Sequence, residues 1–194
     1  HRLKQNNGSL KSLLKEIVLS KTYRQQSIFS DQNPGVRKDT ANRLLWRQNP
    51  RRMDAETIRD SVLLVSGKLN DQTGGPGFED FAYKQAYAPE YNYITADSPN
   101  LWRRSIYRFV VRTTPNRFMT TLDCPDPATF TPKRLNTTTP LQSLALYNNE
   151  FMLRQARYLA ERIKNAAGPK PENQVDQAFR LLFNRLPNPE ESLI

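Results

Sequence analysis

Two consecutive helices are predicted by one run of the chain, Thr139-Pro140-Leu141-Gln142-Ser143-Leu144-Ala145-Leu146-Tyr147-Asn148-Asn149. Thr139 is a typical helix N-cap, Pro140 suits the first helical position, and Gln142 is placed to hydrogen-bond back to the backbone of the cap. The simplest role of Gln142 is therefore to begin a helix, and the run indicates architecture rather than chemistry.

The apolar positions of this run follow helical spacing. Leu141, Leu144 and Ala145 fall at i, i+3 and i+4 and form a stripe that needs a core to face. Asn149 is predicted to cap a second helix. The side chains that recur at helical spacing in this second helix are Phe151, Met152, Gln155, Tyr158 and Leu159. A tight joint between the two helices follows.

Further helices are predicted from caps and apolar stripes elsewhere. One begins after Ser9 and carries a leucine-rich stripe that we expect to belong to the core. Another carries residues 42–46 after a polar loop over 25–38, and a third runs from Asp54 as N-cap to Gly67 as the left-handed C-terminal residue. Two more helical patterns cover 116–122 and 172–184.

The segment 70–100 is predicted to be a long irregular excursion. Its glycines at 74–77 indicate a turn, because a phosphate-binding loop would be followed by Lys and Ser or Thr. The alternation over 104–112 suits a strand, which would pair with 91–95, although helical spacing fits this segment as well. We therefore predict a mainly α fold: an irregular helical domain with long loops and at most one small β-hairpin.

A family resemblance is carried by the run at 139–149 together with other stretches in the same order along the chain. They are IVLSKTYRQ (17–25), NRLLWR (42–47), RRMDAETIRD (51–60), GGP (74–76), RRSIY (103–107), LDCPDP (122–127) and TPKR (131–134). In these stretches the chain resembles the C-terminal domain of unknown function of large planctomycete surface or envelope proteins.

The resemblance implies a setting rather than an activity. In that family, cytochrome-c-type modules often precede this domain, with another domain of unknown function between them. The resemblance implies an exported protein, periplasmic or on the cell surface, whose haem, where it has any, lies outside this chain. No catalytic or ligand residue is transferred by motif. Ser143 and Tyr147 stand where the family pattern has Ala and Leu, and neither departure concerns a functional residue.

The length of 194 residues suits one domain, and we predict a single helical domain over 1–194. The chain begins with His1, and Asn188-Pro189-Glu190-Glu191 near its end is typical of a new helix start. We therefore expect an excised part of a longer exported protein. No apolar run approaches the roughly 20 residues needed to span a bilayer.

Residue types for catalysis and metal binding are scarce. Cys124 is the single cysteine and His1 the single histidine, so the sequence holds no disulfide framework, haem-attachment motif or zinc cluster. A catalytic thiol at Cys124 would lack its usual base, and a small buried or capped side chain is the simpler interpretation. Asp123 and Asp126 fit a glycosidase-like pair or, more simply, turns and caps. We predict no metal site and no cofactor in this chain, and its sequence contains no catalytic motif that would decide whether it is an enzyme.

The formal net charge of +10 is the strongest global indication of function. A positive surface attracts polyanions through long-range, salt-sensitive forces. The candidate partners are anionic polysaccharide, acidic domains of the parent protein, an anionic membrane surface and nucleic acid. The sequence shows no recognised nucleic-acid motif, and the family setting is an exported one, so nucleic acid is the least favoured partner.

Arginines beside tryptophans are the densest candidates for an anion site. One segment supplies Arg43, Trp46, Arg47, Arg51 and Arg52, and the other supplies Trp102, Arg103 and Arg104. Guanidinium groups bind sulfate, phosphate and carboxylate groups through forked hydrogen bonds and stack on aromatic faces. The competing interpretation is structural: salt bridges to Asp54, Asp60, Asp123 or Asp126 would pin loops around a buried tryptophan. We predict that both segments contribute to one positive patch.

Two functional hypotheses follow. The first is a non-catalytic interaction module that docks an acidic partner domain or an anionic polysaccharide through a basic-aromatic surface. The alternative is an accessory half of an active site, completed by the preceding domain in a cytochrome-linked enzyme acting on glycans. The first predicts that the isolated chain binds anions, whereas the second predicts an inert fragment and an active full-length protein.

Overall fold

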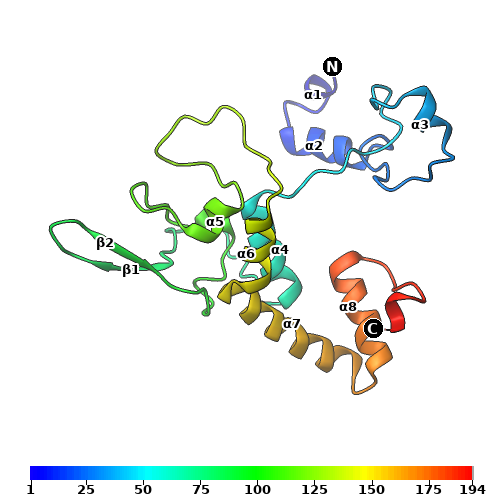
Figure 1. The fold of residues 1–194 in the computed structure, drawn as a ribbon. Coiled ribbons are helices and arrows are strands. Elements are labelled where there is room, and N and C mark those ends of the chain that lie inside the picture. Colours follow the sequence, from blue (N-terminus) through cyan, green and yellow to red (C-terminus); the bar gives the residue numbers. More distant parts are fainter. Residues whose placement is uncertain (194) are drawn as a thin grey trace. The chain divides into compact units, whose positions relative to one another are not determined.

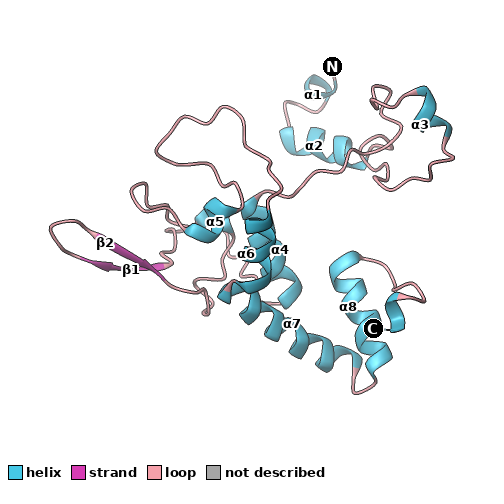
Figure 2. Ribbon diagram, in the orientation of Figure 1, coloured by secondary structure: helices cyan, strands magenta, loops and turns pink. Residues whose placement is uncertain are grey.

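Helices account for most of the regular structure in residues 1–193, the part of the chain that the structure, a computed structural model, describes (Figures 1 and 2). Together with eight α-helices, these residues form one two-stranded antiparallel sheet. The mainly α class is confirmed. The contacts divide the chain into two compact units, His1–Arg52 and Met53–Ile194, which we call the N-terminal and C-terminal units and describe separately. The single domain expected from the length stays a prediction.

The N-terminal unit contains three short helices, α1 (Arg2–Gln5), α2 (Leu10–Leu19) and α3 (Pro34–Lys38). Ser9 caps α2 as predicted, its Oγ accepting from the backbone of Ser12 at 3.3 Å. The core role expected for the stripe of α2 is wrong, because no residue of this helix is buried. Leu10 and Leu14 are 65% and 59% exposed.

The helix expected over 42–46 is absent, and α3 instead forms inside the segment expected to be a loop. Asn33 begins α3 by accepting a hydrogen bond from the backbone of Gly35 at 2.9 Å. The residues after α3 form turns, because Asn42 and Leu45 adopt the left-handed region with φ of 55° and 57°. The carboxylate of Asp39 accepts from two backbone N–H groups in this segment, so it holds the turns in place of a helical carbonyl.

The C-terminal unit contains the longer helices. They are α4 (Ala55–Ser66), α5 (Arg117–Thr121), α6 (Pro140–Asn148), α7 (Glu150–Ala167) and α8 (Pro171–Phe183), with 3₁₀ turns η1 (Ser105–Tyr107) and η2 (Glu191–Leu193). The capping box of α6 is confirmed: Thr139 Oγ1 accepts from the backbone of Gln142 at 3.3 Å, and the Thr139 backbone donates to Gln142 Oε1 at 3.1 Å. Asn149 caps α7 by accepting from the backbone of Phe151.

The core lies where α4 packs against α5 and α7. Its fully enclosed apolar side chains fall in two adjoining clusters, one of Ala55, Ile58, Met119 and Leu122 and the other of Leu63, Ala96 and Phe151. A buried polar contact joins α4 to α7, where Ser66 Oγ donates to Gln155 Oε1 at 2.7 Å. This core forms the base on which the loops of the unit are arranged.

The stripe predicted to turn α6 toward a core is wrong in its direction. Leu141 and Leu144 are 62% and 53% exposed, whereas Leu146 packs on the core. The side chain of Gln142 is buried, and besides closing the capping box it donates to Thr137 Oγ1 at 2.9 Å. Because this amide faces inward, the leucines at the neighbouring stripe positions face outward.

One small hairpin is present, but its strands differ from the predicted pair. Strand β1 (Phe81–Lys84) pairs with β2 (Glu90–Tyr93), and the hairpin projects from the rest of its unit (Figure 1). The strand expected over 104–112 is wrong, because η1 interrupts it. Ser105 donates through both its backbone N–H and its Oγ to Asp60 Oδ1, at 2.8 and 2.7 Å, which fixes the 3₁₀ turn on α4.

Candidate functional site

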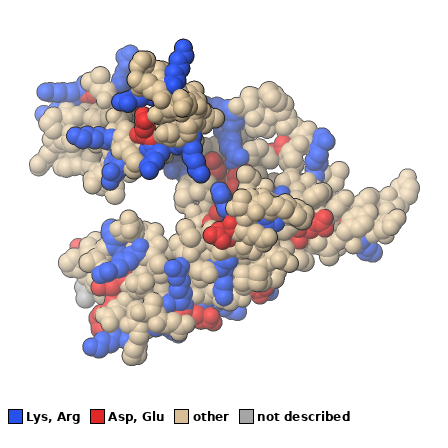
Figure 3. Space-filling view, turned by 180° about the vertical axis from the view of Figure 1, so that it is seen from behind, with Lys and Arg blue, Asp and Glu red and all other residues tan. Residues whose placement is uncertain are grey.

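The positive charge of the chain is concentrated in the N-terminal unit. Residues 1–52 contain 12 Lys and Arg against 3 Asp and Glu, a net charge of +9, whereas residues 53–194 contain 17 against 16, a net charge of +1. In Figure 3 many Lys and Arg side chains project from the N-terminal unit with few acidic neighbours. The attraction for polyanions expected from the whole sequence therefore originates almost entirely in its first quarter.

An open groove in the N-terminal unit combines arginines with aromatic rings. We call it the basic groove; its volume is about 680 Å³, and it is lined by Arg24, Gln25, Gln26, Ile28, Phe29, Ser30, Asn33, Trp46 and Arg47. The Arg47 guanidinium lies 5.1 Å from the Phe29 ring centre and 5.4 Å from that of Trp46, distances typical of cation–π contacts. The two rings meet edge to face at 5.1 Å.

Local contacts hold Trp46 at the groove. Its indole N–H donates to the backbone carbonyl of Asp39 at 2.9 Å. Its ring lies so close to Gly35 that a Cβ on that glycine would approach Trp46 Cδ2 to 2.4 Å. The absence of a side chain at Gly35 therefore lets the indole lie against α3, where it also contacts Phe29 and Arg47.

Several arginines of this unit have no carboxylate partner within the described residues. Arg47 donates to Asn49 Oδ1 at 2.7 Å and approaches the carbonyl of Thr40 at 3.4 Å, both neutral acceptors. Within the described residues, the side chains of Arg24, Arg43 and Arg51 make no hydrogen bond or ion pair. Arg52, by contrast, is half-buried. Guanidinium groups without carboxylate partners, two of them in one groove, are the arrangement expected of a binding surface rather than of a pinned loop.

The second predicted segment lies in the C-terminal unit and is mostly engaged in internal contacts. Arg103 is 7% exposed; it donates to the carbonyls of Pro76 and Gly74, each at 2.6 Å, and approaches that of Gln72 at 3.4 Å. Its guanidinium also stacks 4.2 Å from the ring centre of Tyr107. Arg103 therefore holds the glycine-rich turn at 74–77, which forms as the sequence indicated.

Trp102 and Arg104 differ in their surroundings. Trp102 packs edge to face on Tyr158 at 5.9 Å, and Lys68 Nζ lies 5.1 Å from its ring centre. Arg104 is exposed, with its Nε 3.8 Å from Asp60 Oδ2. The two predicted segments belong to different units, and the structure describes each by itself. Their joint contribution to one positive patch stays a prediction.

The predicted pair of carboxylates serves turns. Asp123, with φ of 61°, accepts from the backbone and the hydroxyl of Thr137. Asp126 accepts from the backbone of Ala128 at 2.8 Å.

Cys124 lies 3.8 Å from Glu56, and burial, together with this carboxylate, raises the pKa of its thiol. A raised thiol pKa disfavours the thiolate, so Cys124 is poorly suited to act as a nucleophile at neutral pH.

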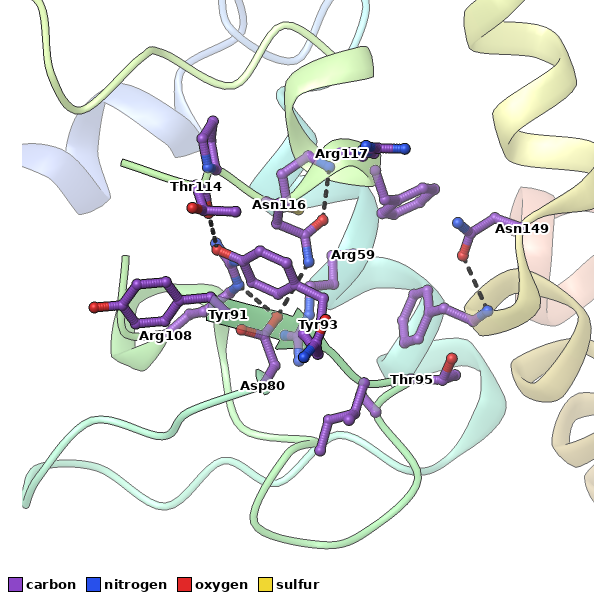
Figure 4. A pocket seen from close by; sticks show the side chains of 17 residues that line it. Arg59, Asp80, Tyr91, Tyr93, Thr95, Arg108, Thr114, Asn116, Arg117 and Asn149 are labelled. Carbon is purple, nitrogen blue, oxygen red and sulfur yellow. Dashed lines mark hydrogen bonds and ion pairs between the residues drawn. The ribbon is translucent and has the colours of Figure 1, made fainter. Parts of the chain in front are cut away.

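The C-terminal unit also contains a cavity of about 450 Å³ between the hairpin, α5 and the start of α7, which we call the inner cavity. At its centre Arg108 Nε donates to Asp80 Oδ2 at 2.7 Å, and Asn116 Nδ2 donates to the same oxygen at 3.3 Å (Figure 4). The side chains of Arg108 and Asp80 are only 6% and 9% exposed. Within the described residues, Asp80 Oδ1 and Arg108 Nη2 are buried and have no hydrogen-bond partner.

The remaining walls of the inner cavity are cationic and aromatic. Arg59 donates to the carbonyls of Arg103 and Leu101, and burial lowers the pKa of its guanidinium although Asp60 and Asp80 act in the opposite direction. Tyr93 donates to the carbonyl of Thr114 at 2.5 Å, and burial raises its pKa. The other rings that line the cavity are those of Tyr91, Phe118 and Phe151.

Sequence reasoning missed both Arg24 and the residues of the inner cavity. Arg24 lies in the polar stretch before α3, far in sequence from either tryptophan, so no local pattern joins it to Trp46. Asp80, Arg108 and Asn116 come from three loops and meet only through the fold. The alternation of arginine and aromatic residues over 104–112 is the one available signal in the sequence, and it predicts a strand rather than a site.

Comparison with known proteins places the chain by family alone. Residues 1–194, the whole chain, match the model of PSD1, described as a protein of unknown function (DUF1553). No curated protein and no solved structure matches the chain. Among the described residues, none of the helices is long and apolar enough to cross a membrane, and no group of three or more His, Cys, Asp or Glu is arranged to hold a metal ion.

Proposed function

The chain belongs to the PSD1 family, a family of proteins of unknown function, and we propose that it is a non-catalytic interaction module that docks an anionic partner through its basic groove. The net charge of +9 on residues 1–52 carries the proposal. Charge of one sign on so small a unit attracts a polyanion from a distance, and the attraction weakens with salt. Arg24 and Arg47 line the groove without carboxylate partners, so their positive charge is not neutralised within the unit.

The partner that we propose is an acidic domain of the parent protein or an anionic polysaccharide. The rings of Phe29 and Trp46 in the groove would pack on the apolar faces of sugar rings, and the guanidinium groups would bind sulfate or carboxylate groups in forked hydrogen bonds. The setting that we propose rests on the family resemblance in the sequence: an exported planctomycete envelope protein, with cytochrome-c-type modules in its other parts.

The experiment is a titration of the chain with a sulfated glycan of heparin type at low and at moderate salt. We expect saturable binding that weakens as salt rises. Replacing Arg24 and Arg47 together by Ala should weaken binding roughly tenfold at low salt, the loss expected for charge-assisted hydrogen bonds on a partly exposed surface. The salt dependence of the remaining binding should also become shallower.

The matched control replaces Arg112 and Arg180 of the C-terminal unit by Ala. Both are exposed and make no side-chain hydrogen bond or ion pair within the described residues, so the net charge changes equally and the groove stays intact. If both double variants weaken binding to the same extent, the attraction is that of net charge alone and the groove is not the site. If the chain binds neither the glycan nor the other domains of its parent at either salt concentration, the proposal fails.

A further inference from the structure

The inner cavity contains a donor and an acceptor that the protein leaves unused. Asp80 Oδ1 and Arg108 Nη2 belong to one ion pair, and both are buried without a hydrogen-bond partner among the described residues. A buried polar group without a hydrogen-bond partner destabilises the structure that contains it. Adjacent hydroxyl groups on one small molecule can satisfy both, because one hydroxyl donates to the carboxylate while its neighbour accepts from the guanidinium.

The charge of the cavity favours an anion. Its lining holds three guanidinium groups, those of Arg59, Arg108 and Arg117, against the single carboxylate of Asp80. The Arg59 donors are used on backbone carbonyls, whereas the exposed Arg117 makes no side-chain hydrogen bond or ion pair within residues 1–193. Figure 4 shows Arg117 on one side of the cavity and the start of α7, at Asn149, on another.

The start of α7 adds to this preference. This helix has 18 residues, and its N-terminal end, at Asn149 and Phe151, lines the cavity. The N-terminus of a long helix attracts negative charge through its free backbone N–H groups and its dipole. Arg117 and the end of α7 thus provide a cationic side of the cavity, distinct from the donor–acceptor pair at its centre.

Aromatic rings complete the lining. Tyr91 and Tyr93 come from β2, Phe118 from α5 and Phe151 from α7. A volume of about 450 Å³ lies within the range of small-molecule sites, roughly 300–1,000 Å³. An apolar wall, a donor beside an acceptor, and a cationic side together fit a ring that carries hydroxyl groups and one acidic group.

We propose that the inner cavity binds a carboxylated sugar unit, with its hydroxyls at Asp80 and Arg108 and its carboxylate toward Arg117 and the start of α7. The carboxylate gains charge-assisted hydrogen bonds at the cationic side. The apolar face of the sugar ring lies against Tyr91. This site belongs to the C-terminal unit and does not depend on the basic groove.

The experiment is a calorimetric titration of the whole chain with glucuronate, glucose and acetate. Glucuronate should saturate the site and bind at least about tenfold more tightly than glucose, which lacks the carboxylate, and than acetate, which lacks the ring. A glucuronate oligosaccharide is a further probe. If it binds more tightly than the monosaccharide, the natural ligand is the end of a polysaccharide chain. If the two affinities are equal, the natural ligand is a free acidic sugar. No saturable binding of glucuronate, or equal binding of all three small probes, overturns the proposal.

Two pairs of variants locate the site. Arg117→Ala should weaken glucuronate binding about tenfold, while Arg112→Ala, a nearby exposed arginine outside the cavity, should leave it unchanged. Tyr91→Ala should weaken binding, while Tyr83→Ala should not. Tyr83 and Tyr91 face each other across the hairpin with ring centres 5.4 Å apart, so either change removes the same ring pair, but only Tyr91 lines the cavity.

These variants also separate this proposal from the one on the basic groove. The double variant at Arg24 and Arg47 should keep its full affinity for glucuronate while it loses affinity for the sulfated glycan. Thermal unfolding of each variant distinguishes lost binding from lost structure. If Arg112→Ala or Tyr83→Ala weakens binding as much as its partner change in a folded protein, the ligand is not in the inner cavity and the assignment is overturned.

Discussion

The N-terminal and C-terminal units differ in how many of their arginines pair with carboxylates of the same unit. In the C-terminal unit several guanidinium groups pair with carboxylates of the same unit, among them Arg108 with Asp80 and Arg134 with Glu56, each at 2.7 Å. In the N-terminal unit Arg2 pairs with Glu16 at 3.8 Å on the surface, whereas the side chains of Arg24 and Arg43 make no hydrogen bond or ion pair within the described residues. Charge that is neutralised within a unit stabilises its loops, whereas charge left without partners is available to another molecule. This difference indicates a scaffolding role for the paired arginines of the C-terminal unit, and it supports the proposed binding role of Arg24 and Arg47 in the basic groove.

The two units also differ in how they use leucine. Leu63 is fully enclosed between α4 and α7, whereas Leu14 on α2 is 59% exposed. We predict that Leu63→Ala lowers the free energy of unfolding by about 3 kcal/mol, because the loss of buried methyl groups adds to the cost of a cavity. Leu14→Ala should change it by less than about 0.5 kcal/mol. Urea unfolding of both variants measures the difference, and a cost at Leu14 close to that at Leu63 would show that the stripe of α2 is covered.

Arg103 and Arg104 sharpen the comparison because the sequence grouped them together. Arg103→Ala removes a guanidinium that serves backbone carbonyls of the glycine-rich turn and should cost about 2 kcal/mol of unfolding free energy. Arg104→Ala loses only an exposed 3.8 Å ion pair and should cost less than about 0.5 kcal/mol. Chemical denaturation tests both. If Arg103→Ala and Arg104→Ala had the same free energy of unfolding, a structural role for Arg103 would be contradicted, and Arg103 would again be a candidate binding residue.

Several helix starts were predictable because capping is a local interaction, but the helix expected over 42–46 is absent and α3 forms in a segment expected to be a loop. Ser9, Asn116, Thr139 and Asn149 all cap the helices expected of them. Which face of a helix lies inward is a different matter: the stripe of α6 follows helical spacing, but the inward amide of Gln142 turns its leucines out. Local pattern establishes where a helix begins, and long-range contacts decide what it faces.

The candidate sites show the same division. Trp46 and Arg47 adjoin in sequence, so their contact was predictable, whereas Arg24 reaches the basic groove only through the turns around α3. Asp80 and Arg108 are 28 residues apart, and Arg108 follows η1, a turn that the sequence did not predict. The residues of a binding site assembled from several loops do not recur at a regular spacing in the sequence. Sequence patterns therefore predict contacts only between those site residues that are close in the sequence.

Two N-caps of the C-terminal unit offer a smaller and more local test. Thr139 makes the capping box of α6, while Asp54 precedes α4 without a side-chain capping hydrogen bond. Thr139→Ala should lower the free energy of unfolding by about 1 kcal/mol, the usual contribution of an N-cap. Asp54→Ala should lower it by only a few tenths of a kcal/mol. Thermal unfolding of the two variants compares them directly. A larger loss at Asp54 would mean that its carboxylate stabilises the helix through charge alone.

The smallest effect that we predict is the pH dependence of the Glu56–Arg134 pair. Arg134 donates to both carboxylate oxygens of Glu56, at 2.7 and 2.9 Å, and these hydrogen bonds lower the pKa of Glu56 in the folded chain. A lowered folded pKa contributes stability that is present above the unfolded pKa, about 4.3, and is lost as pH falls through the folded value. Because both side chains are partly exposed, the pair should contribute less than about 1 kcal/mol. Arg134→Ala should therefore be less stable than the unmodified chain at neutral pH and approach it at about pH 3.

The control for this prediction is Arg157→Ala, which removes an exposed arginine of α7 that makes no side-chain hydrogen bond or ion pair within the described part of the chain. It lowers the net charge by the same amount, so any general effect of charge on acid unfolding appears in both variants. Urea unfolding at a series of pH values measures the free-energy difference for each. The free-energy difference for Arg134→Ala would stay constant from neutral pH down to about pH 3 if the pair did not lower the pKa of Glu56. In that case Arg134 would not be an example of an arginine whose charge is neutralised inside the C-terminal unit, and the contrast with the unpartnered arginines of the N-terminal unit would lose one of its two examples.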